Sequence, residues 1–351
     1  MPDKILSLED VREAAKAKLK GICGVYRICD GQDIRLCQGH SYGSPVGIGG
    51  IGSGASFANN IKALDAICLK SSLIGRDFTP DTGFNFFGRS LSMPVMAASV
   101  SGNQSFGGDS VITEPDLCRA VVTGCKMAGT LGWRGDSFNY SLENAFGIDA
   151  IANEGGWGVQ IVKPRHQATV ISFFRKAERA GCAAVGVDID GYGSSAMARH
   201  HQPVFRKSML DLKELVAATA LPVIIKGVMS VEDAQNALDA GAAAIVVSNH
   251  GGRVLDHTPG TAEVLPAIAQ EVGGKIMVLA DGGVRTGYDV LKMLAAGARA
   301  VLVGRDIVRA AVGGGANGVR MQMEYLRDDL ARAMKMTGCE SLDGISPAVV
   351  C

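Results

Sequence analysis

Short apolar runs rich in β-branched residues recur along most of the chain and alternate with segments of helical period. Each interval between them has the length of one strand, loop and helix. We identify eight runs, which start 22 to 38 residues apart: MPVMAA from Met93, CKMAGT from Cys125, GVQIV from Gly158, AAVGVDI from Ala183, LPVIIKG from Leu221, AAIVVSNHG from Ala243, KIMVLADGG from Lys275 and AVLVGRD from Ala300.

These runs predict an α/β fold, because nearly continuous apolar strands are typical of parallel sheets buried on both faces. Eight parallel units favour a closed TIM (β/α)8 barrel. A doubly wound open sheet is the alternative, but no GxGxxG motif opens the first unit. We expect residues 1–90 to form an amino-terminal arm, helical near residues 7–20 and glycine-rich over 43–54, and residues 91–351 to form the barrel with a carboxyl-terminal helix.

Composition narrows the classes of function. The chain has 351 residues, of which 47% are hydrophobic, so it is able to bury a large core. Its 35 basic and 35 acidic residues give no net charge, which favours a small-molecule partner over nucleic acid. Its apolar runs are far shorter than the ~20 residues of a membrane span, and the start lacks an apolar signal core. We therefore expect a cytoplasmic protein with no membrane partner.

Nine scattered cysteines indicate reduced thiols rather than a disulfide framework. Cys23, Cys29 and Cys37 cluster in a glycine-rich stretch and are the candidates for a metal or iron–sulfur centre. No CxxC pair is present, so we predict no metal site.

Polar residues end several of the predicted strands, where a barrel carries its chemistry. The segment that indicates function most specifically is VVSNHGGRVLD, from 246 to 256. It places His250 and Arg253 three residues apart on a glycine-rich loop. A histidine can take a proton near neutral pH, and an arginine can bind a carboxylate through two parallel hydrogen bonds. The alternative is a capping histidine beside a surface arginine.

The last two strand ends resemble a phosphate cradle. DGGVRTG (281–287) and VGRD (303–306) each offer glycines, backbone amides and an arginine, Arg285 or Arg305. Tight turns would explain the glycines but not both arginines.

Lys226 ends the apolar run LPVIIKG, where a buried cation needs an anionic partner or a ligand. It would suit a flavin ring, and a Schiff base is the competing chemistry.

The chain resembles the FMN-dependent α-hydroxy acid oxidase and dehydrogenase family, which includes glycolate oxidase, lactate oxidase and mandelate dehydrogenase. The resemblance spans about residues 50–345. It is carried by SNHGGRVLD, LPVIIKGVMSVEDA, LADGGVRTGYDVLKMLAAGARAVLVGR and MTGCESLDGIS, with GSGASFANN and LSMPVMAA near the arm and first strand.

The resemblance implies FMN as cofactor and oxidation of a 2-hydroxy acid to a 2-oxo acid. It makes His250 the base, Arg253 the carboxylate anchor and Asp188 the support of the imidazolium. The flavin ring would be held by Ala98, Gln160, Lys226 and Ser248, and the ribityl phosphate by Asp281, Gly282, Gly283, Arg285, Gly304 and Arg305. The family's oligomers, often tetramers, imply a homo-oligomer.

Three positions depart from the family pattern. Two tyrosines are replaced by Gly50 and Val162, and an arginine by Ser195. We therefore expect weaker recognition of a small 2-hydroxy acid, and a larger or differently charged substrate. Two alternatives remain: a flavin isomerase of the type 2 isopentenyl diphosphate isomerase kind, and a flavin-binding protein without turnover.

Overall fold

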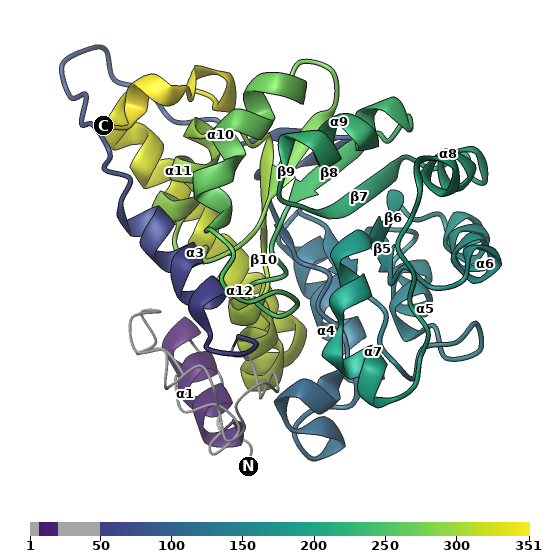
Figure 1. Ribbon diagram of the computed structural model, residues 1–351. Helices are drawn as coiled ribbons and strands as arrows, with labels where there is room; N and C mark the ends of the chain where they lie inside the picture. Colours follow the sequence, from purple (N-terminus) through teal and green to yellow (C-terminus); the bar gives the residue numbers. More distant parts are fainter. Residues whose placement is uncertain (1–6, 20–49) are drawn as a thin grey trace.

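The computed structural model describes residues 7–19 and 50–351. Eight parallel strands form a closed barrel in the order β10-β3-β4-β5-β6-β7-β8-β9 (Figure 1). The predicted TIM barrel is therefore confirmed, and the open doubly wound sheet is wrong. The barrel strands are β3 (Val95–Ala97), β4 (Gly132–Arg134), β5 (Gly158–Val162), β6 (Ala184–Asp188), β7 (Val223–Val228), β8 (Ala244–Val247), β9 (Met277–Ala280) and β10 (Ala300–Val303).

Helices surround the barrel and connect its strands (Figure 1). The last helix is long and has non-helical dihedral angles at Gly315, where two helical segments meet. The helices are α1 (Leu8–Lys18), α3 (Ala55–Asp65), α4 (Glu114–Met127), α5 (Phe146–Asn153), α6 (Gln167–Arg179), α7 (Ser195–Arg199), α8 (Met209–Ala217), α9 (Val231–Asp239), α10 (Thr261–Val272), α11 (Gly287–Ala295) and α12 (Arg305–Thr337).

Side chains alternate between two cores along each barrel strand. In β7, Ile224 packs inside the barrel, whereas Val223 and Ile225 pack against the outer helices. Both sets are fully or almost fully buried, because successive residues of a strand point to opposite faces. This double burial explains why the strands read as nearly continuous apolar runs.

One predicted strand is misplaced. The run CKMAGT from Cys125 forms the last turn of α4 and the connection after it, and the second barrel strand is β4. Cys125 is fully buried on the inner face of that helix, so the apolar residues around it form a run like that of a buried strand. The strand itself contains the buried Arg134, which breaks the expected apolar pattern.

The arm packs along the barrel instead of standing apart. The helix predicted near residues 7–20 is α1, which lies beside α12 (Figure 1). Further along, an antiparallel hairpin of β1 (Phe84–Phe86) and β2 (Arg89–Leu91) buries its apolar side chains against the barrel interior. The boundary between arm and barrel at residue 90 stays a prediction.

Candidate active site

A cavity lies at the carboxyl ends of the barrel strands, where the sequence predicted the chemistry. Ten predicted site residues line it: Ala98, Lys226, His250, Arg253, Asp281, Gly282, Gly283, Arg285, Gly304 and Arg305. Asp188, Gln160 and Ser248 are buried and are not among the lining residues. Phe57 and Ile61 of α3 also line the cavity, so the predicted arm forms part of the site.

The loop that carries His250 is fixed by hydrogen bonds at its start. His250 has a left-handed backbone conformation, with φ of 57°, which is uncommon outside glycine and asparagine. Its N–H donates to Ser248 Oγ at 3.1 Å. The side chain of Asn249 is buried and pairs with that of Asn60 on α3 through two hydrogen bonds of 2.8 and 3.1 Å. These contacts hold the imidazole in one direction.

The same loop is fixed at its far end by the arm. Asp256 Oδ2 accepts hydrogen bonds from the backbone N–H of Ser53 at 2.6 Å and from its hydroxyl at 2.8 Å. Ser56 Oγ donates to the carbonyl of Leu255 at 2.9 Å. The GSGAS segment of the arm therefore positions the His250 loop, which explains why the two motifs occur together.

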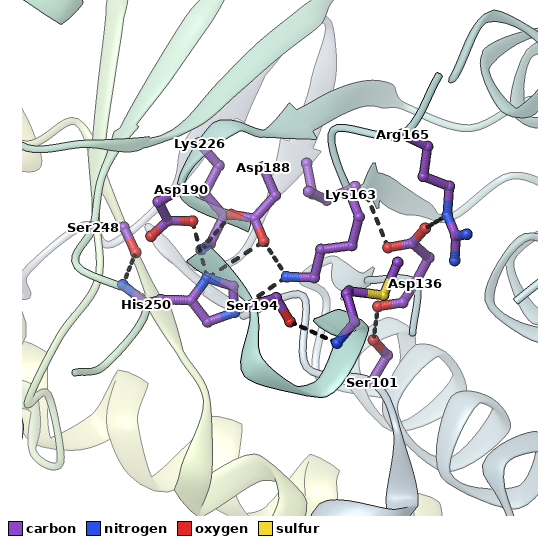
Figure 2. A network of polar contacts seen from close by, with 12 residues as sticks. Ser101, Asp136, Lys163, Arg165, Asp188, Asp190, Ser194, Lys226, Ser248 and His250 are labelled. Atoms are coloured by element: carbon purple, nitrogen blue, oxygen red, sulfur yellow. Dashed lines mark hydrogen bonds and ion pairs between the residues drawn. The ribbon is translucent and has the colours of Figure 1, made fainter. Parts of the chain in front are cut away.

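Polar groups surround the His250 ring on both sides (Figure 2). Its Nδ1 lies 3.0 Å from Asp190 Oδ1 and 3.4 Å from Asp188 Oδ2. Its Nε2 lies 3.4 Å from the ammonium nitrogen of Lys163. An ammonium group only donates, so Nε2 must be the acceptor and Nδ1 must carry the proton. This tautomer leaves the lone pair on the nitrogen that faces Lys163.

Electrostatics keep His250 neutral. Burial, together with the cations Lys163, Lys226 and Arg253, lowers its pKa well below 6.5 despite the opposing effect of Asp188. Since a neutral imidazole is the form that accepts a proton, the ring is a competent base at neutral pH.

The two carboxyl groups beside the ring have opposite protonation behaviour. Burial and the nearby Asp188 raise the pKa of Asp190 well above its usual value. Burial acts the same way on Asp188, but His250, Lys163 and Lys226 outweigh it and hold the pKa of Asp188 well below its usual value. Asp188 is thus the anionic member of the pair, and the Oδ2 atom of Asp190 has no hydrogen-bond partner among the described residues.

Lys226 has an anionic partner, Asp188, whose Oδ1 is 3.1 Å from its ammonium nitrogen. Burial lowers the pKa of Lys226, but the carboxylates of Asp188, Asp190 and Asp281 outweigh it and raise the pKa above 10.5. A lysine held in its protonated form is a poor nucleophile, so the geometry disfavours the Schiff-base hypothesis.

Asp188, Asp190 and His250 place ligand atoms within 4.8 Å of one another, which is close enough to hold a metal ion. The ammonium groups of Lys163 and Lys226 already contact Asp188, and their charge opposes a further cation. Cys23, Cys29 and Cys37 lie outside the described residues, so the structure does not bear on the cluster that they form in the sequence.

The last two strand ends also line the cavity. Gly304 precedes α12, whose first residue Arg305 donates from Nη2 to the carbonyl of Gly251 at 2.8 Å. Gly282 and Gly283 have φ of 106° and 83°, and a Cβ on either would collide with neighbouring residues of the α3 and α10 region. Tight packing therefore explains these two glycines, as the alternative proposed, while both arginines of the motif line the cavity.

The three departures from the family pattern have different structural consequences. A Cβ at Gly50 would lie 3.0 Å from Gly54 Cα and 3.1 Å from Phe57 Cβ, so a side chain there would require these neighbours to shift. Val162 is fully buried in the outer core. Ser195 lines the cavity with a short side chain where the family has an arginine, and the apolar side chains of Phe138 and Met197 line the same cavity.

Two residues of the site were missed by the sequence analysis: Lys163 and Asp190. Lys163 directly follows β5, and Asp190 lies two residues after Asp188 in a short 3-10 helix (Ile189–Gly193). The signal for both is their position at the ends of predicted strands, since Lys163 lies three residues after Gln160 and Asp190 two residues after Asp188.

Comparisons with known proteins identify the family of this chain. The sequence profile of FMN-dependent dehydrogenases matches residues 47–209 and 193–351. The chain belongs to this family. A 4-hydroxymandelate oxidase from Amycolatopsis orientalis is 34% identical over 84% of this chain and 89% of its own length. An L-lactate oxidase from Alicycliphilus denitrificans is 32% identical over 85% of this chain and 88% of its own.

Solved structures confirm the fold of this family member. A mandelate oxidase variant with 2-hydroxy-phenylacetamide covers 97% of this chain and 96% of its own, with a TM-score of 0.76 and 30% identity. The predicted family, its enzymatic nature and its cofactor FMN are confirmed. No helix within residues 7–19 and 50–351 is long and apolar enough to cross a membrane.

The residues of the cavity fit an FMN group. Asp281 Oδ1 is buried and has no hydrogen-bond partner among the described residues, although Asp281 lines the cavity, so a ribityl hydroxyl would satisfy it. Arg285, Arg305 and Arg309 line the region around the start of α12, where positive charge and a helix amino terminus favour a phosphate. Lys226 supplies a fixed cation, which suits a reduced flavin ring.

Proposed function

We propose that this family member oxidises a 2-hydroxy acid to the corresponding 2-oxo acid, with His250 as the base and Arg253 as the carboxylate anchor. One observation carries the proposal: a neutral imidazole, with its Nδ1 proton directed at two carboxyl groups, lies in the same cavity as Arg253. Adding hydroxy acids to the protein under nitrogen, while its visible spectrum is recorded, tests this function.

Each residue has a distinct task in the proposed reaction. Arg253 lines the cavity three residues after His250 and binds the carboxylate, which orients C2 of the substrate towards the base. His250 Nε2 accepts a proton either from C2 or from the hydroxyl group. Asp188 stabilises the resulting imidazolium, and Asp190 keeps Nδ1 protonated and the ring oriented. Bound FMN supplies the two-electron acceptor for the oxidation.

We propose the same FMN-binding roles that the resemblance implies. Ala98, Gln160, Lys226 and Ser248 would hold the ring, and Asp281, Gly282, Gly283, Arg285, Gly304 and Arg305 the ribityl phosphate. Gln160 and Ser248 are buried and do not themselves line the cavity. The Gln160 side chain is fixed by the Tyr140 hydroxyl at 3.1 Å and the Ile161 carbonyl at 2.9 Å.

Arg285→Ala should weaken FMN binding without unfolding the protein. A charge-assisted hydrogen bond contributes about 1.5–3 kcal/mol, so we expect the dissociation constant for FMN to rise about 10- to 100-fold. Recovery of flavin fluorescence on dilution measures this change. Arg299→Ala is the matched control, because Arg299 pairs with Asp343 at an exposed position outside the cavity. Equal FMN retention in the two variants would remove Arg285 from the phosphate site.

The short side chain of Ser195, in place of the family's arginine, favours a substrate with a bulky apolar group at C2. Phe138, Met197 and Val254 line the same cavity as Arg253, and burial of apolar surface stabilises such a group by about 25 cal/mol per Å². The relatives named above include an oxidase of 4-hydroxymandelate as well as one of L-lactate. We therefore place aromatic 2-hydroxy acids ahead of lactate.

Two other functions make different predictions for the same protein. A flavin isomerase of the type 2 isopentenyl diphosphate isomerase kind would rearrange a carbon skeleton under reducing conditions and would not be bleached by hydroxy acids. A flavin-binding protein without turnover would show a flavin spectrum that no substrate changes. The position of His250 and Arg253 in one cavity favours the oxidase over both.

We also propose that the protein is a cytoplasmic homo-oligomer, with a tetramer as the expected form. Family resemblance supports the oligomer, and the charge and hydropathy of the sequence support the location. Size-exclusion chromatography with light scattering should give a mass of about four times 36.5 kDa. A mass of one chain across a range of concentrations would contradict the oligomer.

A further inference from the structure

Lys163 is a second cation beside the base, and none of the roles proposed above uses it. It follows the last residue of β5, and its ammonium nitrogen lies 2.7 Å from Asp188 Oδ2 and 3.4 Å from His250 Nε2 (Figure 2). Its side chain is 12% exposed and lines the cavity. A charged group so placed needs a functional explanation, because burial of a cation is costly.

The surrounding residues hold Lys163 in this position. Its backbone N–H donates to Asp136 Oδ1 at 2.8 Å, and Asp136 Oδ2 accepts from Arg165 Nε at 2.7 Å. The stem of the side chain passes over Gly191. A Cβ at Gly191 would lie 2.7 Å from Lys163 Cδ and 3.3 Å from its Nζ, so a larger residue there would displace the lysine side chain.

The geometry brings the ammonium group to the reacting end of the imidazole. A substrate hydroxyl that donates to His250 Nε2 would also lie within reach of the Lys163 ammonium, because the two nitrogens are only 3.4 Å apart. The ammonium has three donors, of which Asp188 uses one and His250 Nε2 a second, so one is left for the substrate oxygen. Val162, the preceding residue, stands where the family has a tyrosine, so Lys163 reaches into the cavity from the same strand end without that hydroxyl.

We infer that Lys163 is a further catalytic residue, which donates a hydrogen bond to the oxygen on C2 of the substrate. When the O–H bond breaks, an N–H bond forms at His250 Nε2 and negative charge remains on the oxygen. The Lys163 ammonium stabilises this oxygen, while Asp188 stabilises the imidazolium. The inference rests on the proposed function and names the group that replaces the missing hydroxyl.

The charges around His250 also predict a pH effect. The ring faces Asp188 at the end of β6, Asp190 after it, Lys226 on β7, Asp281 after β9, Arg253 on its own loop and Lys163 after β5. Burial and the three cations lower the pKa of His250, and Asp188 raises it. Removal of the Lys163 charge should therefore raise that pKa, so the base becomes protonated at a higher pH.

Lys163→Met tests the inference in the FMN-loaded enzyme, since methionine keeps most of the stem and removes the charge. We expect the rate constant for flavin reduction by saturating 2-hydroxy acid to fall about 10²- to 10³-fold, as for loss of one oxyanion donor. The acid limb of kcat/KM should move to higher pH. Lys226 still contacts Asp188 in this variant, which favours retention of the fold. Lys176→Met, at a position outside the cavity, is the control.

Two further variants keep the test decisive if Lys163→Met does not fold. Lys163→Ala should recover part of its reduction rate when methylammonium is added, whereas a packing defect would not respond. Gly191→Ala should lower the rate by displacing the lysine, with FMN content unchanged.

Several outcomes would overturn the inference. These are an unchanged reduction rate in Lys163→Met, a loss confined to KM with kcat retained, or an acid limb that stays in place. If the unmodified enzyme is bleached by hydroxy acids and Lys163→Met behaves identically, only the role of Lys163 fails. If no hydroxy acid bleaches the unmodified enzyme, the proposed function fails and this role fails with it.

Discussion

His250→Ala should retain FMN but lose about 10²- to 10⁴-fold in the rate constant for flavin reduction by substrate, the range measured for general acid–base groups. The physical reason is the loss of the only neutral nitrogen base that the described residues place in the cavity. Stopped-flow absorbance under nitrogen measures the rate. Because the pKa of His250 lies below 6.5, the unmodified enzyme should keep its reduction rate at pH values below 6.5, where a free histidine would be protonated.

A control on the same loop separates chemistry from backbone effects. His257 also has a positive φ, of 59°, but its side chain is 76% exposed, so His257→Ala should leave the reduction rate unchanged. His250→Asn is the second variant, since asparagine tolerates the left-handed conformation. Rapid flavin reduction in both His250 variants would contradict the assignment of the base.

Arg253→Ala should reduce kcat/KM for 2-hydroxy acids by about 30- to 5,000-fold. Loss of one partner of a desolvated charge pair costs about 2–5 kcal/mol, which corresponds to a change of this size. Steady-state kinetics with the carboxylate and with its primary amide measure the effect of charge alone. The unmodified enzyme should prefer the carboxylate, and the variant should lose this preference.

The substitution Arg253→Lys distinguishes geometry from charge, because an ammonium group cannot form the two parallel hydrogen bonds of a guanidinium. We expect partial activity, with KM affected more than kcat. If Arg253→Ala keeps the full preference for the carboxylate over the amide, another residue is the anchor.

The barrel could be predicted from sequence because its strands are buried on both faces. Ile224 and Ile225 point in opposite directions and are both fully buried, so this strand appears in the sequence as a short apolar run. Prediction failed at β4, where Arg134 is buried in a strand and Cys125 is buried in a helix. Local hydropathy does not distinguish these cases, because tertiary packing decides them.

Site residues could be predicted from the sequence where they lie in a short motif at the end of a predicted strand. His250, Arg253 and Lys226 line the cavity as expected. Lys163 and Asp190 also lie at strand ends, but their contacts with His250 depend on distances between segments that follow different strands. Lys163 lies 87 positions from His250 in the sequence and 3.4 Å from it in space.

The arm shows a second limit of sequence analysis. Its glycine-rich end was expected to precede the barrel, yet Ser53 and Asn60 hold the loop of His250, and Phe57 lines the cavity. Pairings such as Ser53 with Asp256 join residues 203 positions apart. Only the fold brings these segments together.

The most direct test of the account is the visible spectrum of the purified protein under nitrogen during addition of 2-hydroxy acids. The panel should range from lactate to aromatic acids such as mandelate, each paired with its amide. The account predicts an oxidised flavin spectrum that is bleached by at least one of the acids, fastest with an aromatic one. A bound flavin that no 2-hydroxy acid bleaches would contradict it.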